Sequence, residues 1–143
     1  MRILLVGSVV AAALVAATSA SAQAPAHDEQ MTLRVIMQEL AVEYVRAANA
    51  LMTDDYQTLE EVGRAIEHHP LPDPIVAAIK RTLGKGFSAF EKVDERSHAA
   101  AVALARQAAA KNSAGAAKAF ADLSTACVSC HTQFRAKLKP LSD

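Results

Sequence analysis

The 143-residue sequence contains little glycine, proline or aromatic residue: five glycines, five prolines, four phenylalanines, two tyrosines and no tryptophan. The glycines and prolines fall mainly at interruptions between alanine-rich stretches, which favours an all-helical chain. With so few aromatic residues, few bulky side chains are available to fill the core of a domain of this size. A large, flat, apolar ligand would fill a core that is otherwise lined by small side chains.

An excess of charge of one sign is also lacking. The chain has 15 lysines and arginines against 15 aspartates and glutamates. It therefore offers no strong electrostatic field to a nucleic acid or an anionic membrane, and we expect neither as a partner. The sequence shows no internal repeat, low-complexity tract or interdomain linker, which indicates one domain.

The N-terminal residues are typical of a secretory signal peptide. Arg2 precedes an apolar run over residues 3–17, and the small residues 20–22 form a cleavage site, with cleavage after Ala24 as the alternative. The run is short for a membrane anchor and reaches Thr18 and Ser19 before any stop-transfer charge. We therefore expect residues 1–22 to be removed, residues 23–143 to form the domain, and the protein to lie in the periplasm without a stable membrane anchor.

Apolar residues recur at steps of three and four along four long stretches. This spacing predicts helices over about residues 29–52, 56–68, 87–111 and 114–139, with a short helix over 74–83. We expect Asp54 to cap the second helix, Asp73 to cap the short one, and Gly84 to end it. Short or moderate connections predict an all-α, up-down-up-down four-helix bundle with a short extra helix between the second and third main helices.

The most informative stretch is Cys127-Val128-Ser129-Cys130-His131, which holds both cysteines. Two thiols three residues apart, followed at once by a histidine, form the attachment pattern of c-type haem. Each thiol adds to one haem vinyl group, and the histidine supplies an axial nitrogen to the iron. The pattern lies on an inward helical stripe that comprises Ala116, Phe120, Leu123, Cys127, Cys130, Phe134 and Leu138.

Three other roles are open to a Cys-x-x-Cys pair. A redox-active dithiol follows a strand and sits at a helix N-terminus, whereas this pair lies within a predicted helix. A disulfide between these positions would close a very small loop and stabilise little. A zinc site would need further ligands at partner spacing, and none is evident. We therefore favour one covalent haem c with its iron, whose thiols are presented reduced to a haem-attachment machinery.

An exported chain of this length, with four helices and the haem signature near its C-terminus, resembles the class II c-type cytochromes, the cytochrome c′ family. Class I cytochromes carry the signature near the N-terminus instead. Phe134-Arg135 is similar to the aromatic–arginine pair that the family often shows after the histidine. We expect a one-electron carrier, not an enzyme, that serves an unidentified periplasmic redox partner. Many members of the family form dimers, so a homodimer is open beside a monomer.

The axial position opposite His131 decides the function. In an up-down-up-down bundle the first and last helices are antiparallel neighbours. Met37 lies roughly 12 Å from the predicted helix start at Glu29, and His131 roughly 10 Å before Leu138, so the two stand at similar heights. Met37 is therefore the predicted distal ligand, and low-spin members of the family use a methionine of the first helix there. The alternative is that Met37 only fills the core.

Arg34 lies three residues before Met37 and four before Gln38. Family members often carry a basic or polar residue four before the distal position. If Gln38 faces the iron, the site is high-spin and five-coordinate, and it binds nitric oxide or carbon monoxide. Arg34 and Arg135 are one helical turn from the two predicted ligands, so we expect them to pair with haem propionates, with exposure to solvent as the alternative.

Three further histidines stay outside the predicted site. His68 and His69 end the second helix, where they complement its dipole or form a surface metal site. His98 lies near the apolar stripe of the third main helix and is expected to be a hydrogen-bonded structural histidine, with haem ligation as the alternative.

Overall fold

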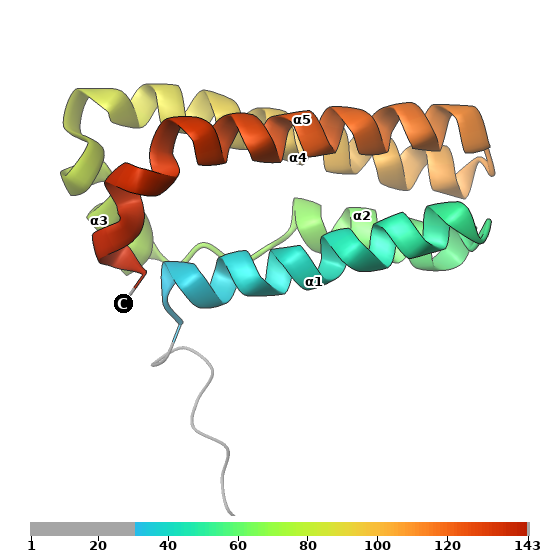
Figure 1. Cartoon of the computed structure of the whole chain (residues 1–143), viewed down its shortest axis with the longest axis horizontal. Helices are drawn as coiled ribbons and strands as arrows, with labels where there is room; N and C mark the ends of the chain where they lie inside the picture. The colour runs from blue at the N-terminus through green and yellow to red at the C-terminus, as the bar shows by residue number, and fades with distance from the viewer. Residues whose placement is uncertain (1–30, 143) are drawn as a thin grey trace, which may run out of the picture.

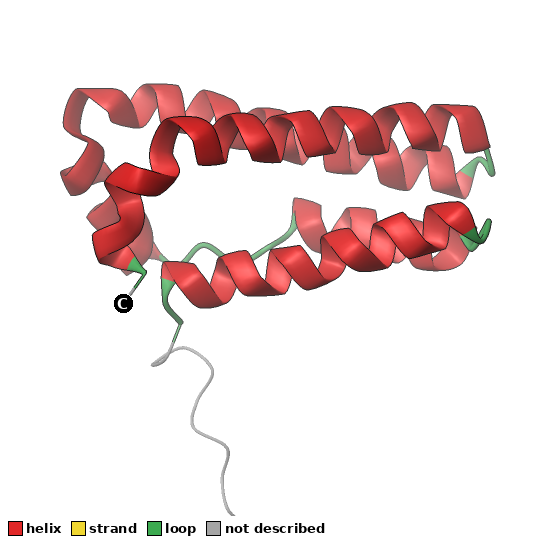
Figure 2. Ribbon diagram, viewed as in Figure 1, coloured by secondary structure: helices red, strands yellow, loops and turns green. Residues whose placement is uncertain are grey.

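The computed structural model describes residues 31–142, and these form a bundle of helices (Figures 1 and 2). The four main helices are α1 (Leu33–Met52), α2 (Tyr56–Glu67), α4 (Phe87–Ala109) and α5 (Ser113–Leu138). The shorter α3 (Asp73–Leu83) lies between α2 and α4, and single 3₁₀ turns follow α3 and α5 at Gly84–Gly86 and Lys139–Leu141. No strand occurs within residues 31–142. The predicted all-α four-helix bundle with a short extra helix is confirmed.

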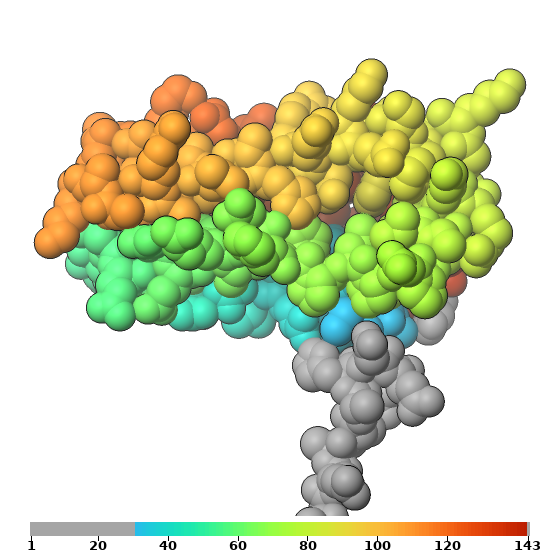
Figure 3. Space-filling model, turned by 180° about the vertical axis from the view of Figure 1, so that it is seen from behind, coloured from blue at the N-terminus to red at the C-terminus, as the bar shows by residue number. Residues whose placement is uncertain are grey.

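Successive main helices run in opposite directions, as Figure 1 shows. α4 packs most closely against α5 and α2, and α1 packs against α2, whereas α1 and α5 contact each other little. The start of α1 therefore lies beside the end of α5, with a gap between the two helices. Seen from behind, α2, α3 and α4 cover the opposite face (Figure 3).

The buried side chains form two clusters along the bundle. The first joins all four main helices, and its fully buried members include Leu59, Leu104 and Leu123. The second includes Ile79 of α3, Phe90 of α4 and Phe134 of α5. The rings of Phe90 and Phe134 meet edge to face with centroids 5.6 Å apart. The haem-attachment pattern lies where one cluster gives way to the other.

Gly63 allows α2 and α4 to approach closely. A Cβ atom at this position would lie 2.8 Å from the backbone nitrogen of Ala105 and 3.0 Å from the carbonyl oxygen of Ala101. A Cβ atom is not found this close to a backbone nitrogen, so a larger residue would force the two helices apart. The alanines of α4 and the glycine of α2 thus bring the helix axes together where few bulky side chains are available.

The first helix starts later than predicted. Thr32 adopts an extended conformation and its Oγ1 accepts a hydrogen bond of 3.3 Å from the backbone N–H of Val35, which makes it the N-cap. Met31 is likewise not helical. The predicted start at Glu29, like the predicted signal peptide over 1–22 and its cleavage sites, lies outside the described residues.

Two caps are displaced by one residue. Asp55, not Asp54, caps α2, because its side chain accepts a 3.1 Å hydrogen bond from the N–H of Thr58 while Asp54 takes a left-handed φ of 54°. The short helix begins at Asp73 itself, with Pro72 at the N-cap position. Gly84 ends that helix as predicted, with a φ of 50°.

The third main helix ends two residues earlier than predicted. Lys111 has a φ of 51°, and a left-handed residue cannot continue a right-handed helix. The chain then reverses, and the side chain of Asn112 caps α5 by accepting a 3.0 Å hydrogen bond from the N–H of Gly115. No helix among residues 31–142 is long and apolar enough to cross a membrane.

Candidate functional site

A cavity of about 910 Å³ opens between the start of α1 and the end of α5. Pockets of this size are typical of sites that enclose a small-molecule ligand or cofactor. α4 and the connection between α2 and α3 complete its walls. The cavity is lined by Leu33, Arg34, Met37, Gln38, Ala41, His69, Leu71, Phe90, Asp94, Cys130, His131, Thr132, Phe134, Arg135, Ala136, Leu138, Lys139 and Ser142.

The cavity brings together most of the residues that the sequence singled out. Met37 lines it from α1, and Cys130 and His131 line it from α5. Arg34 and Arg135 also line it, one from each helix. The loose packing of α1 against α5 leaves room between these side chains, since the two helices contact each other little.

Cys127 is the one predicted site residue that does not line the cavity. Its side chain packs against the first hydrophobic cluster, whereas Cys130, one turn further along α5, packs against the second. Both thiols are free and half-buried, and His131 is exposed. Residues three apart share a helix face, so the two cysteines follow one another along the inner side of α5.

Burial raises the pKa of both thiols. Desolvation alone accounts for the raised pKa of Cys127. For Cys130, burial together with the negative charges of Asp94 and Cys127 raises the pKa to about 11. Redox-active dithiols need a lowered thiol pKa, and this pair also lies far from the start of α5 at Ser113. The environment is therefore unlike that of a thiol–disulfide oxidoreductase.

On the α1 side, Met37 and Gln38 both line the cavity but differ in burial. Met37 is half-buried and packs against the second cluster, whereas Gln38 is exposed. The other two methionines of the described chain do not line the cavity: Met31 precedes α1, and Met52 lies at the far end of the helix with 80% of its surface exposed. Met37 is therefore the methionine available to a ligand in this cavity.

Positive charge gathers at the rim. Arg34, Arg135 and Lys139 are exposed and line the cavity, and Asp94 is its one carboxylate within residues 31–142. The apolar part of the wall includes Leu33, Leu71, Phe90 and Phe134. An apolar interior with cationic side chains at its rim suits a flat apolar ligand that carries carboxylates. Lys139 was not part of the predicted site.

No protein-family model, curated protein or solved structure matches this chain. The resemblance to the cytochrome c′ family therefore rests on Cys127, Cys130 and His131, on Phe134-Arg135, and on the order of the helices. What the site can do has to be argued from its own geometry.

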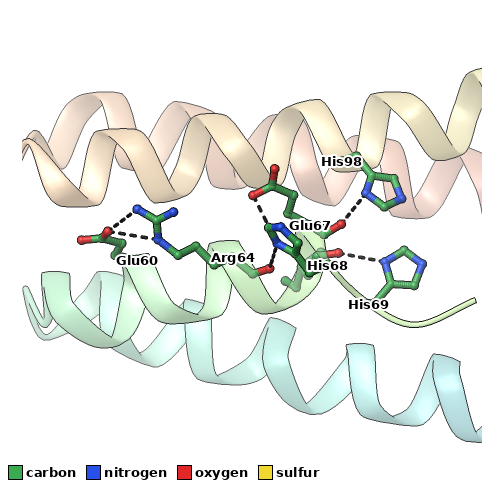
Figure 4. A network of polar contacts seen from close by, with 7 residues as sticks. Glu60, Arg64, Glu67, His68, His69 and His98 are labelled. Carbon is green, nitrogen blue, oxygen red and sulfur yellow. Dashed lines mark hydrogen bonds and ion pairs between the residues drawn. The ribbon is translucent and has the colours of Figure 1, made fainter.

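The sequence did not predict that His69 and Asp94 would reach the same cavity. His69 stacks on His98, with ring centroids 4.9 Å apart. Figure 4 shows the two rings side by side, with His68 pointing elsewhere because its Nδ1 lies 2.9 Å from the carbonyl oxygen of Arg64. The ring of His69 thus stands with that of His98 rather than with that of its sequence neighbour His68.

Proposed function

We propose that the protein is a mono-haem c-type cytochrome that carries single electrons in the periplasm. Haem c would be bound covalently to Cys127 and Cys130, and His131 and Met37 would hold the iron. The observation that carries this proposal is the cavity itself, in which a methionine of α1 and the cysteine–histidine pair of α5 line one space.

The residues present fit a haem in three respects. The cavity combines a sufficient volume of about 910 Å³ with an apolar wall that includes Phe90 and Phe134. The two thiols are free, as attachment requires. Val128, between the cysteines, is 64% exposed and His131 is exposed, so the motif can be reached by a haem-attachment machinery.

When bound, the haem supplies a one-electron couple between ferric and ferrous iron. His131 would hold the iron from α5, and the thioether of Met37 would hold it from α1. Methionine opposite histidine favours the ferrous state and raises the reduction potential. If His131 and Met37 both held the iron, no room would be left on it for a substrate, and we propose no enzymatic activity.

The remaining cavity residues orient the group and set the local charge. Arg34 and Arg135 are placed to pair with the two propionates by charge-assisted hydrogen bonds. Leu33, Leu71 and Phe134 keep water from the interior. The opening between α1 and α5 would leave one edge accessible to a redox partner.

The position of Gln38, which lines the same cavity as Met37, supports a second candidate function. If Gln38 stands opposite His131, the iron is five-coordinate and high-spin. The protein would then bind nitric oxide or carbon monoxide at the open position.

One experiment separates the two functions. The protein is produced with an intact haem-attachment system, its spin state is recorded, and the reduced form is exposed to carbon monoxide. The electron-carrier proposal predicts a low-spin spectrum, a reversible one-electron redox titration and no rapid carbon monoxide binding, all unchanged by Gln38→Ala. A high-spin spectrum with rapid carbon monoxide binding would establish the second function instead.

A further inference from the structure

A cluster of three side chains, two of which line the cavity, has the composition of a metal site. His69 comes from the connection between α2 and α3, and Asp94 and His98 come from α4. One ligand atom from each lies within 4.8 Å of the others. We propose that His69, Asp94 and His98 bind one divalent transition-metal ion, at a site distinct from the haem iron.

A hydrogen bond to a backbone carbonyl oxygen holds each imidazole by its Nδ1 atom. Nδ1 of His69 lies 2.8 Å from the carbonyl oxygen of Ile66, and Nδ1 of His98 lies 2.7 Å from that of Glu67 (Figure 4). A carbonyl oxygen only accepts hydrogen bonds, so each Nδ1 carries the proton and donates. Nε2 of each ring keeps its lone pair for a ligand. Metal-binding histidines in proteins are commonly held by such a bond from the other ring nitrogen.

The charges around the cluster favour a cation between its members. Nε2 of His98 stands 3.4 Å from Oδ2 of Asp94. With Nδ1–H of His98 committed to Glu67, the contact is an ion pair when His98 is protonated; when the ring is neutral, Nε2 and Oδ2 are both acceptors, and a bound cation would join them. Glu91 and Glu95 line the adjoining groove with Asp94 and His98 and add negative potential, which Lys92 of the same groove offsets only in part.

The ligand set selects the class of metal. Two imidazoles and one carboxylate suit zinc or copper, whereas magnesium and calcium prefer oxygen ligands alone. The ligand atoms of a tetrahedral zinc ion stand roughly 3.3 Å apart, so the three side chains would close by rotation from their present separation. His69 and Asp94 also line the haem cavity, so the fourth coordination position would face that space.

Such an ion would tie the proline-containing connection after α2 to the middle of α4. His98 already links α4 to the last residue of α2 through its hydrogen bond to the carbonyl oxygen of Glu67. A ligand that binds only the folded state adds stability, so metal binding should raise the melting temperature of the protein.

Zinc titration of the purified protein, stripped of metal with a chelator, tests the proposal. Calorimetry should show one saturable site per chain and leave the haem spectrum unchanged. In His69→Asn and His98→Asn, the asparagine amide keeps a hydrogen-bond donor near the place of Nδ1, but the ligand atom Nε2 is lost. These variants therefore separate metal binding from folding. Each should weaken zinc binding by at least about tenfold, and Asp94→Asn, which breaks no backbone hydrogen bond, should do the same.

His68→Asn is the matched control, because His68 is a neighbouring exposed histidine outside the cluster. It should bind zinc as the wild type does, and zinc should raise the melting temperature of this control but not of His98→Asn. In a preparation without haem the thiols are alkylated first, so that Cys127 and Cys130 do not compete. Absence of saturable binding by the wild type, or an equal loss in His68→Asn and His98→Asn, would overturn the proposal.

Discussion

Met37 of α1 and His131 of α5 line the same cavity from two antiparallel helices. The relationship follows from the order of the bundle, which sets the first turns of α1 beside the last turns of α5. These two helices contact each other less than the other neighbouring pairs of main helices do. The space between them is where we propose that the iron is held.

Replacement of Met37 by leucine should open the iron to external ligands. Met37→Leu keeps the volume of a side chain that packs against the second cluster and removes the sulfur. The ferric protein should become high-spin, and the reduced protein should bind carbon monoxide, as measured by absorption spectroscopy. Met52→Leu, at an exposed position at the far end of α1, is the control and should change neither property. A low-spin spectrum in Met37→Leu would remove Met37 from the ligand set.

The two cavity arginines should influence the reduction potential. A positive charge near the iron disfavours the ferric state, so Arg34→Gln and Arg135→Gln should each lower the potential by roughly 20–70 mV. Arg46→Gln is the control, because Arg46 lies outside the cavity and its guanidinium stands 2.8 Å from the carboxylate of Glu43. This variant should change the reduction potential little. Potentials are measured by spectroelectrochemical titration. Equal shifts in all three variants would mean that the arginines act only through net charge.

The pKa of Cys130 should be measurable in the haem-free protein. Burial, Asp94 and Cys127 raise it from 9.0 to about 11, so the folded state holds this proton more tightly than the unfolded chain does. The associated stability is present below about pH 9 and is lost as the pH rises through about 11. The thiolate absorbance in the ultraviolet follows the titration directly.

Asp94→Asn removes a negative charge and should lower the pKa of Cys130. Glu95→Gln is the control, because it removes one negative charge from the exposed residue next to Asp94. If the two variants shift the pKa equally, Asp94 has no special effect on the thiol.

Gly63 should be intolerant of a side chain. In Gly63→Ala the new Cβ meets the backbone of Ala105, and overpacking of this kind costs about 1–3 kcal/mol. Alanine gains up to about 1 kcal/mol over glycine in a helix, so the net effect is a loss on the order of 1 kcal/mol. Gly86→Ala, where the nearest atom is 3.9 Å from the new Cβ, is the control. Urea denaturation that finds Gly63→Ala at least as stable as the wild type would contradict the close approach of α2 and α4.

Helical periodicity predicted the fold and the inner face of α5 correctly. Leu123, Phe134 and Leu138 are buried as expected, because a 3.6-residue repeat marks the core face of a helix irrespective of its partners. The caps were less certain, since adjacent residues such as Asp54 and Asp55 have the same capping chemistry. The hydrogen bond from Thr58 to the side chain of Asp55 and the left-handed φ of Asp54 decide between them.

The cluster of His69, Asp94 and His98 could not be predicted in the same way. His69 lies in an irregular connection with Pro70 and Pro72, and no periodic pattern gives the path of such a segment. Its stacking on His98 depends on how α2 ends and where α4 passes. For Met37 and His131, by contrast, the rise per residue of two regular helices led us to expect similar heights, and the structure places both residues in the lining of one cavity.

Covalent haem attachment is the central claim, and extraction of the protein with acidified acetone tests it most directly. The protein is produced with a haem-attachment system beside the double variant Cys127→Ser/Cys130→Ser. If haem is attached to the two cysteines, haem absorption should stay with the wild-type chain after extraction, and the variant should have lost covalent haem. A wild-type protein that is colourless, or whose haem is fully extracted, would show that haem is not covalently attached.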